Sequence, residues 1–172
     1  MDKLDKLSLL AIVVLIVSTF FLVVVYADDT QSRDRFALQH QVTAFNPELE
    51  KKVKTAQGLL ENNNLIKARE LARVLISEFP YDGTPHMVIG DVELRNQDPV
   101  AAMESYRKAV DLNRDYLDKK TEVFQGKKIK ATVLEAKVII EKELATSPGN
   151  DDLRGKRKTV YYMLRRIAGS CG

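Results

Sequence analysis

Residues 98–112 of this 172-residue chain read DPVAAMESYRKAVDL, and this stretch decides the fold. Asp98 followed by Pro99 is a helix start, because an Asp side chain caps free backbone N–H groups and proline is favoured at the first helical position. A small residue then recurs at intervals of 34 residues, at Ala68, Ala102 and Ala136. A period of this length is typical of stacked helical hairpins, so the sequence predicts an all-α repeat protein.

Similar helix starts and stops divide the chain on both sides of this stretch. Asn46-Pro47 and Thr84-Pro85 are starts of the same kind, and the asparagines at 62–64 favour a turn because Asn accepts left-handed backbone angles. The expected helices cover residues 47–61, 65–79, 85–96, 99–112, 116–125, 131–145 and 151–168. Within 47–148 they form three hairpins, 47–80, 84–114 and 116–148, and a basic capping helix and tail follow at 149–172.

The second hairpin resembles a unit of the tetratricopeptide repeat family. Its small, alanine, aromatic and alanine positions are Gly90, Ala102, Tyr106 and Ala109. Family positions are also occupied by Ala56, Ala68 and Pro80 in the first hairpin and by Ala136 and Pro148 in the third. The chain departs from the family pattern because it has no Trp, has Phe124 where a small residue is usual, and has Arg114 in place of a closing proline. The resemblance implies a short α-solenoid.

The resemblance also implies a concave face, lined by the first helix of each hairpin, that binds protein segments. In this sequence the lining residues are Gln57, Leu60, Met87, Asp91, Leu94, Arg95, Gln125 and Lys128. Amide groups suit a partner's backbone, and Met and Leu adapt to apolar side chains. Family members that hold chaperone C-terminal carboxylates use a Lys, Asn and Arg clamp, which these positions do not supply. The alternative is an ordinary solvated helix surface.

The C-terminal end is basic, with six basic residues against two acidic ones from Gly149 onward. The six are Arg154, Lys156, Arg157, Lys158, Arg165 and Arg166. We expect this patch to contact anionic lipid head groups or an acidic partner. The alternative is again a solvated helix face. Nucleic acid is not an expected partner, because the repeats are expected outside the cytoplasm.

An apolar run precedes the repeats. Residues 9–25 carry no charge and have Ser18 and Thr19 as their polar members, so they are able to span a bilayer as one helix. We therefore expect an N-terminal tail at 1–8, a transmembrane anchor at 9–26 and a stalk at 27–46. A secretory signal cleaved after Ala27 is the alternative, although the run is longer than the usual apolar core of a signal peptide.

The basic residues around the apolar run favour one orientation. Lys3, Lys6 and the terminal amine precede the run, whereas Arg33 and Arg35 follow it. Because basic residues concentrate on the cytoplasmic side of an anchor, this slight bias places the N-terminus in the cytoplasm. The expected location is the bacterial inner membrane, single-pass, with the repeats in the periplasm.

No sequence motif indicates catalysis. There is no nucleophile elbow, phosphate-binding loop or metal-spaced group of His and Cys, and a lone Cys171 cannot form an internal disulfide. We expect no enzymatic activity, cofactor, metal or small-molecule substrate. The leading hypothesis is a membrane-anchored scaffold that binds proteins as a subunit or assembly factor of a cell-envelope complex. The alternatives are a periplasmic chaperone of the cytochrome c maturation or translocon quality-control type, and a cytosol-facing membrane receptor.

Overall fold

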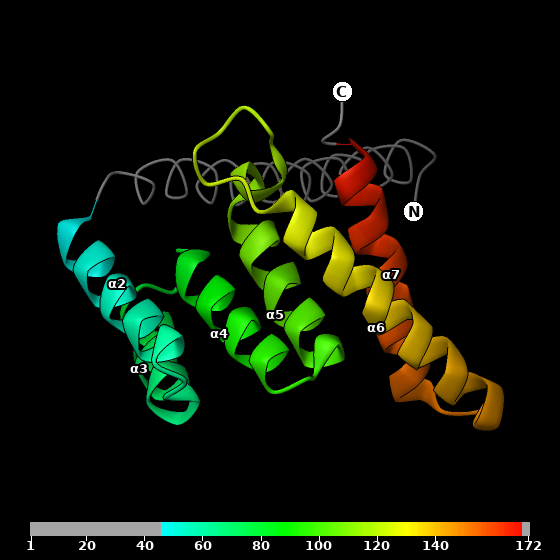
Figure 1. The fold of residues 1–172 in the computed structure, drawn as a ribbon. Coiled ribbons are helices and arrows are strands. Elements are labelled where there is room, and N and C mark those ends of the chain that lie inside the picture. The colour runs from blue at the N-terminus through cyan, green and yellow to red at the C-terminus, as the bar shows by residue number, and fades with distance from the viewer. Residues whose placement is uncertain (1–45, 170–172) are drawn as a thin grey trace, which may run out of the picture. The chain divides into compact units, whose positions relative to one another are not determined.

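The computed structural model describes residues 46–169, and these form an all-helical unit (Figure 1). The elements are α2 (Pro47–Glu61), α3 (Leu65–Glu78), α4 (Thr84–Arg95), α5 (Pro99–Leu112), the 3-10 helix η1 (Arg114–Leu117), α6 (Gly126–Thr146) and α7 (Asp151–Gly169). No strand occurs between residues 46 and 169, so the expected all-α class is confirmed for this range.

The expected tail at 1–8 and anchor at 9–26 lie outside the described residues, as does the stalk up to residue 45. Cys171 lies outside them as well. Among the helices of residues 46–169, none combines the length and the apolar character that crossing a bilayer requires.

The turns of the first two helical pairs repeat the same backbone geometry 34 residues apart. Between α2 and α3, the N–H of Asn63 donates to the carbonyl of Leu60 at 3.0 Å. Between α4 and α5, the N–H of Gln97 donates to the carbonyl of Leu94, also at 3.0 Å. Asn63 and Gln97 have positive φ angles of 56° and 61°. The repeat in the sequence is therefore a repeat of turn geometry.

The helix caps that follow these turns repeat in the same way. The side-chain oxygen of Asn64 accepts the N–H of Lys67 at 3.4 Å at the start of α3. The side-chain oxygen of Asp98 accepts the N–H of Ala101 at 2.9 Å at the start of α5. Each cap satisfies a backbone donor that the first helical turn leaves free, which fixes where the second helix of each pair begins.

The cores of the first two pairs fill equivalent positions with residues of different size. Gly90 of α4 lies against the ring of Tyr106 of α5, and a Cβ on Gly90 would come within 2.3 Å of that ring. The residues 34 positions earlier are Ala56 and Ala72, which are fully buried in the first pair. A glycine beside a large ring in one pair thus corresponds to two alanines in the other.

The other residues expected to hold the repeats together are also buried. Ala68, Ala102, Ala109 and Ala136 have no exposed surface. Pro80 and Pro148 are exposed and lie just beyond the ends of α3 and α6.

The third helical pair differs from the expected one. The helix expected at 116–125 is absent: η1 ends at Leu117, and a loop runs from residue 118 to the start of α6. In this loop the hydroxyl of Thr121 donates to the carbonyls of Asp115 and Asp118, at 2.7 and 2.9 Å. Asp118 in turn accepts the N–H of Lys120 at 2.9 Å. Such side-chain bonds to backbone compete with helix formation, which explains why the expectation was wrong.

Helix α6 begins five residues before its expected start and pairs with α7 (Figure 1). It packs against both α5 and α7, and α7 also contacts α5. Ala136 therefore lies on the first helix of its pair, whereas Ala68 and Ala102 lie on the second helix of theirs. The pairs are stacked consecutively, because α2 and α3 both pack against α4 as well.

Candidate functional site

The residues expected to line a concave face are only partly exposed. Leu60 and Met87 belong to the hydrophobic cores, with exposed fractions of 7% and 6%. Gln57 is exposed, and Leu94 and Gln125 are half-buried. Arg95 donates to the carbonyl of Leu60 at 2.7 Å, close to the end of α2, where a cation is favoured by the helix dipole.

Asp91 and Lys128 form a link between helices. The carboxylate of Asp91 on α4 accepts the hydroxyl of Tyr106 on α5 at 2.5 Å and the Nζ of Lys128 on α6 at 2.6 Å. The Lys128 ammonium also lies 5.5 Å from the centroid of the Tyr106 ring. Burial raises the pKa of Tyr106 strongly, and the negative charge of Asp91 adds to this shift. The three residues therefore join the second pair to the third.

Two residues of the expected basic patch are paired within their own helix. The guanidinium of Arg154 lies 3.4 Å from the carboxylate of Asp151, and the Nζ of Lys156 lies 2.7 Å from that of Asp152. The hydrogen bond to Asp152 raises the pKa of Lys156. These pairs neutralise the start of α7.

A third member of the patch, Arg166, holds α7 against α5. Its guanidinium donates to the carbonyl of Val110 at 3.3 Å and lies 3.9 Å from the carboxylate of Asp111. The Tyr162 hydroxyl donates to Asp111, and this hydrogen bond raises the pKa of Tyr162, as does its burial. The guanidinium of Arg107 also lies 5.1 Å from the centre of the Tyr162 ring. Arg166 is therefore part of the packing between helices.

The remaining basic residues of the third pair project into solvent. Among residues 46–169, six exposed cations of α6 and α7 have no carboxylate within ion-pair distance. They are Lys127, Lys130 and Lys142 of α6, and Arg157, Lys158 and Arg165 of α7. Three large apolar side chains are exposed among them, Leu134 at 44%, Val138 at 66% and Tyr161 at 46%. We call these nine residues the outer face of the third pair.

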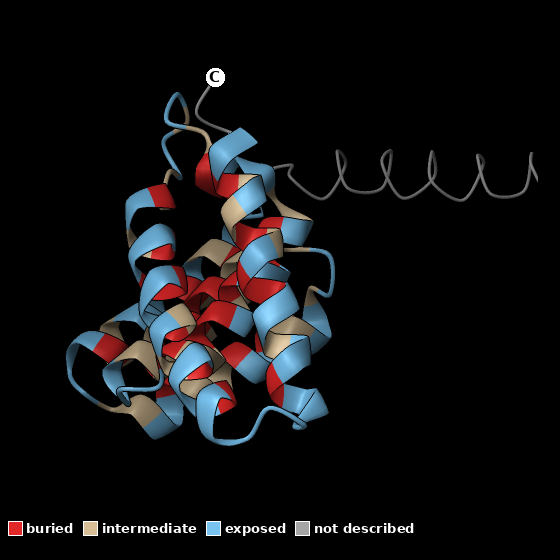
Figure 2. Cartoon of the chain, turned by 90° about the vertical axis from the view of Figure 1, so that its right-hand side faces the viewer, coloured by how far each residue is buried: buried red, intermediate tan, exposed pale blue. Residues whose placement is uncertain are grey.

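Figure 2 views the molecule from the side on which α6 and α7 lie, and exposed residues line the outer sides of the helices there. The α6 half of the outer face was not among the residues predicted from sequence. The sequence nevertheless contains a pattern that predicts this half of the face. Residues 127, 130, 134, 138 and 142 follow steps of three or four, which place them on one side of a helix.

The charge of the described chain is concentrated in the third pair. Residues 126–169 contain eleven Lys and Arg and five Asp and Glu, a net charge of +6. Residues 46–125 contain twelve and fourteen of these, a net charge of −2. The third pair is therefore the electropositive end of the array.

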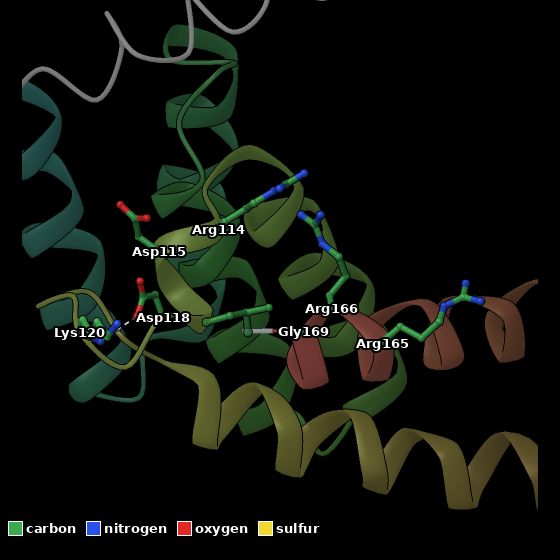
Figure 3. A pocket seen from close by; sticks show the side chains of 8 residues that line it. Arg114, Asp115, Asp118, Lys120, Arg165, Arg166 and Gly169 are labelled. Atoms are coloured by element: carbon green, nitrogen blue, oxygen red, sulfur yellow. Dashed lines mark hydrogen bonds between the residues drawn. The ribbon is translucent and has the colours of Figure 1, made fainter. Parts of the chain in front are cut away.

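A pocket of about 440 Å³ lies between η1, the following loop and the end of α7 (Figure 3). Its lining includes Arg114, Asp115, Asp118, Lys120 and Arg166. Figure 3 shows Arg114 and Arg166 extending on one side of it and the two aspartates lying on the other. Because both signs of charge line this pocket, it has no clear preference for an anion or a cation. Within residues 46–169, no group of three or more His, Cys, Asp or Glu is arranged to hold a metal ion.

Comparison with protein-family models and with curated proteins found no match to this chain.

Proposed function

We propose that the chain is a membrane-anchored scaffold of the tetratricopeptide repeat type, which binds other proteins as a subunit or assembly factor of a bacterial cell-envelope complex. The observation that carries this proposal is the repetition, 34 residues apart, of the turn and cap hydrogen bonds of α2–α3 in α4–α5. Helical pairs stacked in this way present a long continuous surface, and such surfaces are used to bind proteins.

The exposed side chains of the array support binding to protein. Gln57 of α2 is free to bond a partner's backbone, and Leu94 is half-buried on α4, one helical pair further along. On the first pair, Ile66 and Val74 of α3 are exposed at 72% and 50% and lie eight residues apart, on one side of the helix. Apolar side chains exposed in this way favour contacts with a partner.

The anchor rests on the sequence alone. Residues 9–25 form an uncharged run of the length that spans a bilayer, and the basic residues before it favour a cytoplasmic N-terminus. The proposed location is therefore the bacterial inner membrane, with the helical array in the periplasm. Protease treatment of spheroplasts tests this orientation: the array is digested in intact spheroplasts if it is periplasmic, and protected if it faces the cytosol.

Affinity purification of the tagged full-length protein from membranes in mild detergent tests the scaffold function. We expect stoichiometric partners that stay bound in high salt, identified by mass spectrometry. A Gln57→Ala and Leu94→Ala double variant should lose partners held on the first helices, whereas the matched control Lys119→Ala and Glu122→Ala, at exposed positions of the loop between η1 and α6, should keep them. Many weak, substoichiometric proteins would instead favour the chaperone alternative, and recovery of the native protein as a free monomer would contradict the proposal.

A further inference from the structure

We propose that the outer face of the third pair binds the anionic surface of a lipid bilayer. This proposal deepens the proposed function and rests on it in one respect, because the anchor is what brings the array close to lipid. The face itself is defined by the described residues of α6 and α7.

The unpaired cations of this face outnumber the unpaired carboxylates beside them, because Glu135 and Glu143 are the two acidic residues between 126 and 169 that form no ion pair there. Of the eleven basic residues between 126 and 169, five pair with carboxylates and the other six have no such partner within residues 46–169. Glu141 pairs with Lys137 at 3.7 Å, and Asp151 and Asp152 pair with Arg154 and Lys156. An anionic surface would supply the missing counter-charge.

The placement of the cations and apolar residues suits a flat surface. On α6, Leu134 and Val138 are one turn apart, with Lys130 one turn before them and Lys142 one turn after. On α7, Tyr161 lies one turn from Arg157 and one turn from Arg165. The Lys137 ammonium lies 5.9 Å from the centre of the Tyr161 ring, which shows that the two helices are neighbours at this level. Cations therefore flank the apolar side chains along both helices.

Lipid is a better fit to this arrangement than an acidic protein segment. Charge distinguishes this face from the exposed Ile66 and Val74 of α3, because residues 126–169 carry a net charge of +6. Leu134, Val138 and Tyr161 protrude among the unpaired cations, each with 44% or more of its surface exposed. Protruding Leu and Val side chains can enter the head-group region, and Tyr is enriched at membrane–water interfaces. Each Lys or Arg near an anionic surface strengthens binding by about fivefold.

The absence of Trp from the sequence provides a direct test. A Tyr161→Trp variant places the chain's single indole on the outer face, and a Tyr81→Trp variant places it at an exposed position between α3 and α4 as the matched control. Each full-length variant is reconstituted into vesicles of phosphatidylcholine alone, or of equal parts phosphatidylcholine and phosphatidylglycerol, with bromine-labelled acyl chains as quencher.

In the Tyr161→Trp protein we expect blue-shifted, bromine-quenched emission in the anionic vesicles and not in the neutral ones. High salt should reverse the change, because it screens exposed charges. The Tyr81→Trp control should not respond. Adding Arg157→Gln and Lys158→Gln removes two cations. We expect it to lower the ratio of molecules whose outer face is bound to lipid to those whose outer face is free by roughly 30-fold. Lys67→Gln and Arg73→Gln on α3 remove the same charge and should leave the ratio unchanged.

Equal emission of the Tyr161→Trp variant in the two vesicle types would overturn the proposal. So would a blue shift produced by soluble polyglutamate but not by anionic vesicles, which would assign the face to an acidic protein. Extraction with alkaline carbonate separates this question from anchoring. If carbonate removes the chain from vesicles while the indole still responds to anionic lipid, the anchor fails and the lipid-binding face stands.

Discussion

The first two helical pairs and the third share a 34-residue spacing of alanines but not a structure. In the first two pairs the turn residues are Asn62, Asn63 and Asn64, and Asn96, Gln97 and Asp98. The residues 34 positions further on are Lys130, Ala131 and Thr132, and they lie inside α6. Lys and Ala favour helix, whereas Asn and Asp favour turns and caps. The difference teaches that turn chemistry, more than the spacing of small residues, decides where one helix becomes two.

The largest expected effect is at the core position that distinguishes the second pair from the first. Tyr106→Ala removes a fully buried ring and the hydrogen bond to Asp91, and gives α5 the residue that α3 has at Ala72. We expect the free energy of unfolding to fall by about 3–5 kcal/mol, as for other large aromatic truncations in cores. Urea denaturation of the full chain in mild detergent, followed by circular dichroism, measures this. A loss below about 1 kcal/mol would contradict the packing described here.

The next effect is a loss of folding stability at alkaline pH that depends on Tyr116, which lies in η1 between the second and third pairs. Burial raises the pKa of Tyr116 to about 12, an effect that its hydrogen bond with Thr84 partly opposes. Because the unfolded chain releases this proton near pH 10, stability is complete below pH 10 and is lost as pH rises toward 12. The contribution is about 1.4 kcal/mol per pH unit in this window.

Tyr116→Phe keeps the ring and removes this ionisation. The variant should therefore lose stability less steeply than the parent chain between pH 10 and pH 12. Urea midpoints measured across the window give the two slopes. Tyr81→Phe, at an exposed position, is the control and should leave the slope unchanged. Equal slopes for the parent chain and Tyr116→Phe would show that Tyr116 is not buried as described.

A smaller effect tests whether Gly90 is needed to make room for the ring of Tyr106. Gly90→Ala introduces the residue found at the equivalent position, Ala56, but its Cβ would come within 2.3 Å of the Tyr106 ring. The ring is fully buried and must shift, so we expect a loss of about 1–3 kcal/mol. In a Tyr106→Ala background the same substitution should cost much less. Additive losses from the two changes would show that these positions do not share space.

The smallest effect sharpens the comparison of the two turns. Gln97 and Asn63 both hold left-handed backbone angles, which glycine adopts without strain and which Asn tolerates better than Gln. Gln97→Gly should stabilise the chain by about 1 kcal/mol, and Asn63→Gly should stabilise it less. Thermal denaturation of both variants gives the ranking. The reverse ranking would mean that the side chain of Gln97 makes compensating contacts.

The first four helices could be predicted within one residue at each end because local residues mark their starts and stops. Asn46, Asn64 and Asp98 accept N–H groups of the first helical turn, and such residues are recognisable from sequence alone. Thr84 was expected to cap α4 in the same way, but α4 begins at Thr84 and has no side-chain cap, so Pro85 in its first turn marks its start. The start of α6 has neither a side-chain cap nor a proline in its first turn, and its first residue, Gly126, follows a loop held by local hydrogen bonds. Its boundary was therefore predicted incorrectly.

The surfaces were harder to predict than the helices. Asp91 and Lys128 were expected to face a partner, yet they bind each other across 37 residues of sequence. That pairing depends on how α6 packs against α5, which brings Lys128 within reach of Asp91 on α4 and which no local pattern specifies. The three unpaired cations of α7 were within the predicted patch, whereas those of α6 required the continuous helix to place them on one side.

The continuous helix α6 holds the cations at its two ends at a fixed distance from each other. A helix of 21 residues is about 31 Å long, so Lys127 and Lys142, which are 15 positions apart, are separated along the axis by about 22 Å. A hinge where the first two pairs have a turn would let this distance vary. Without such a turn, Lys127 and Lys142 move together as parts of one rigid helix. An anionic surface that contacts both must therefore present negative charge at that spacing.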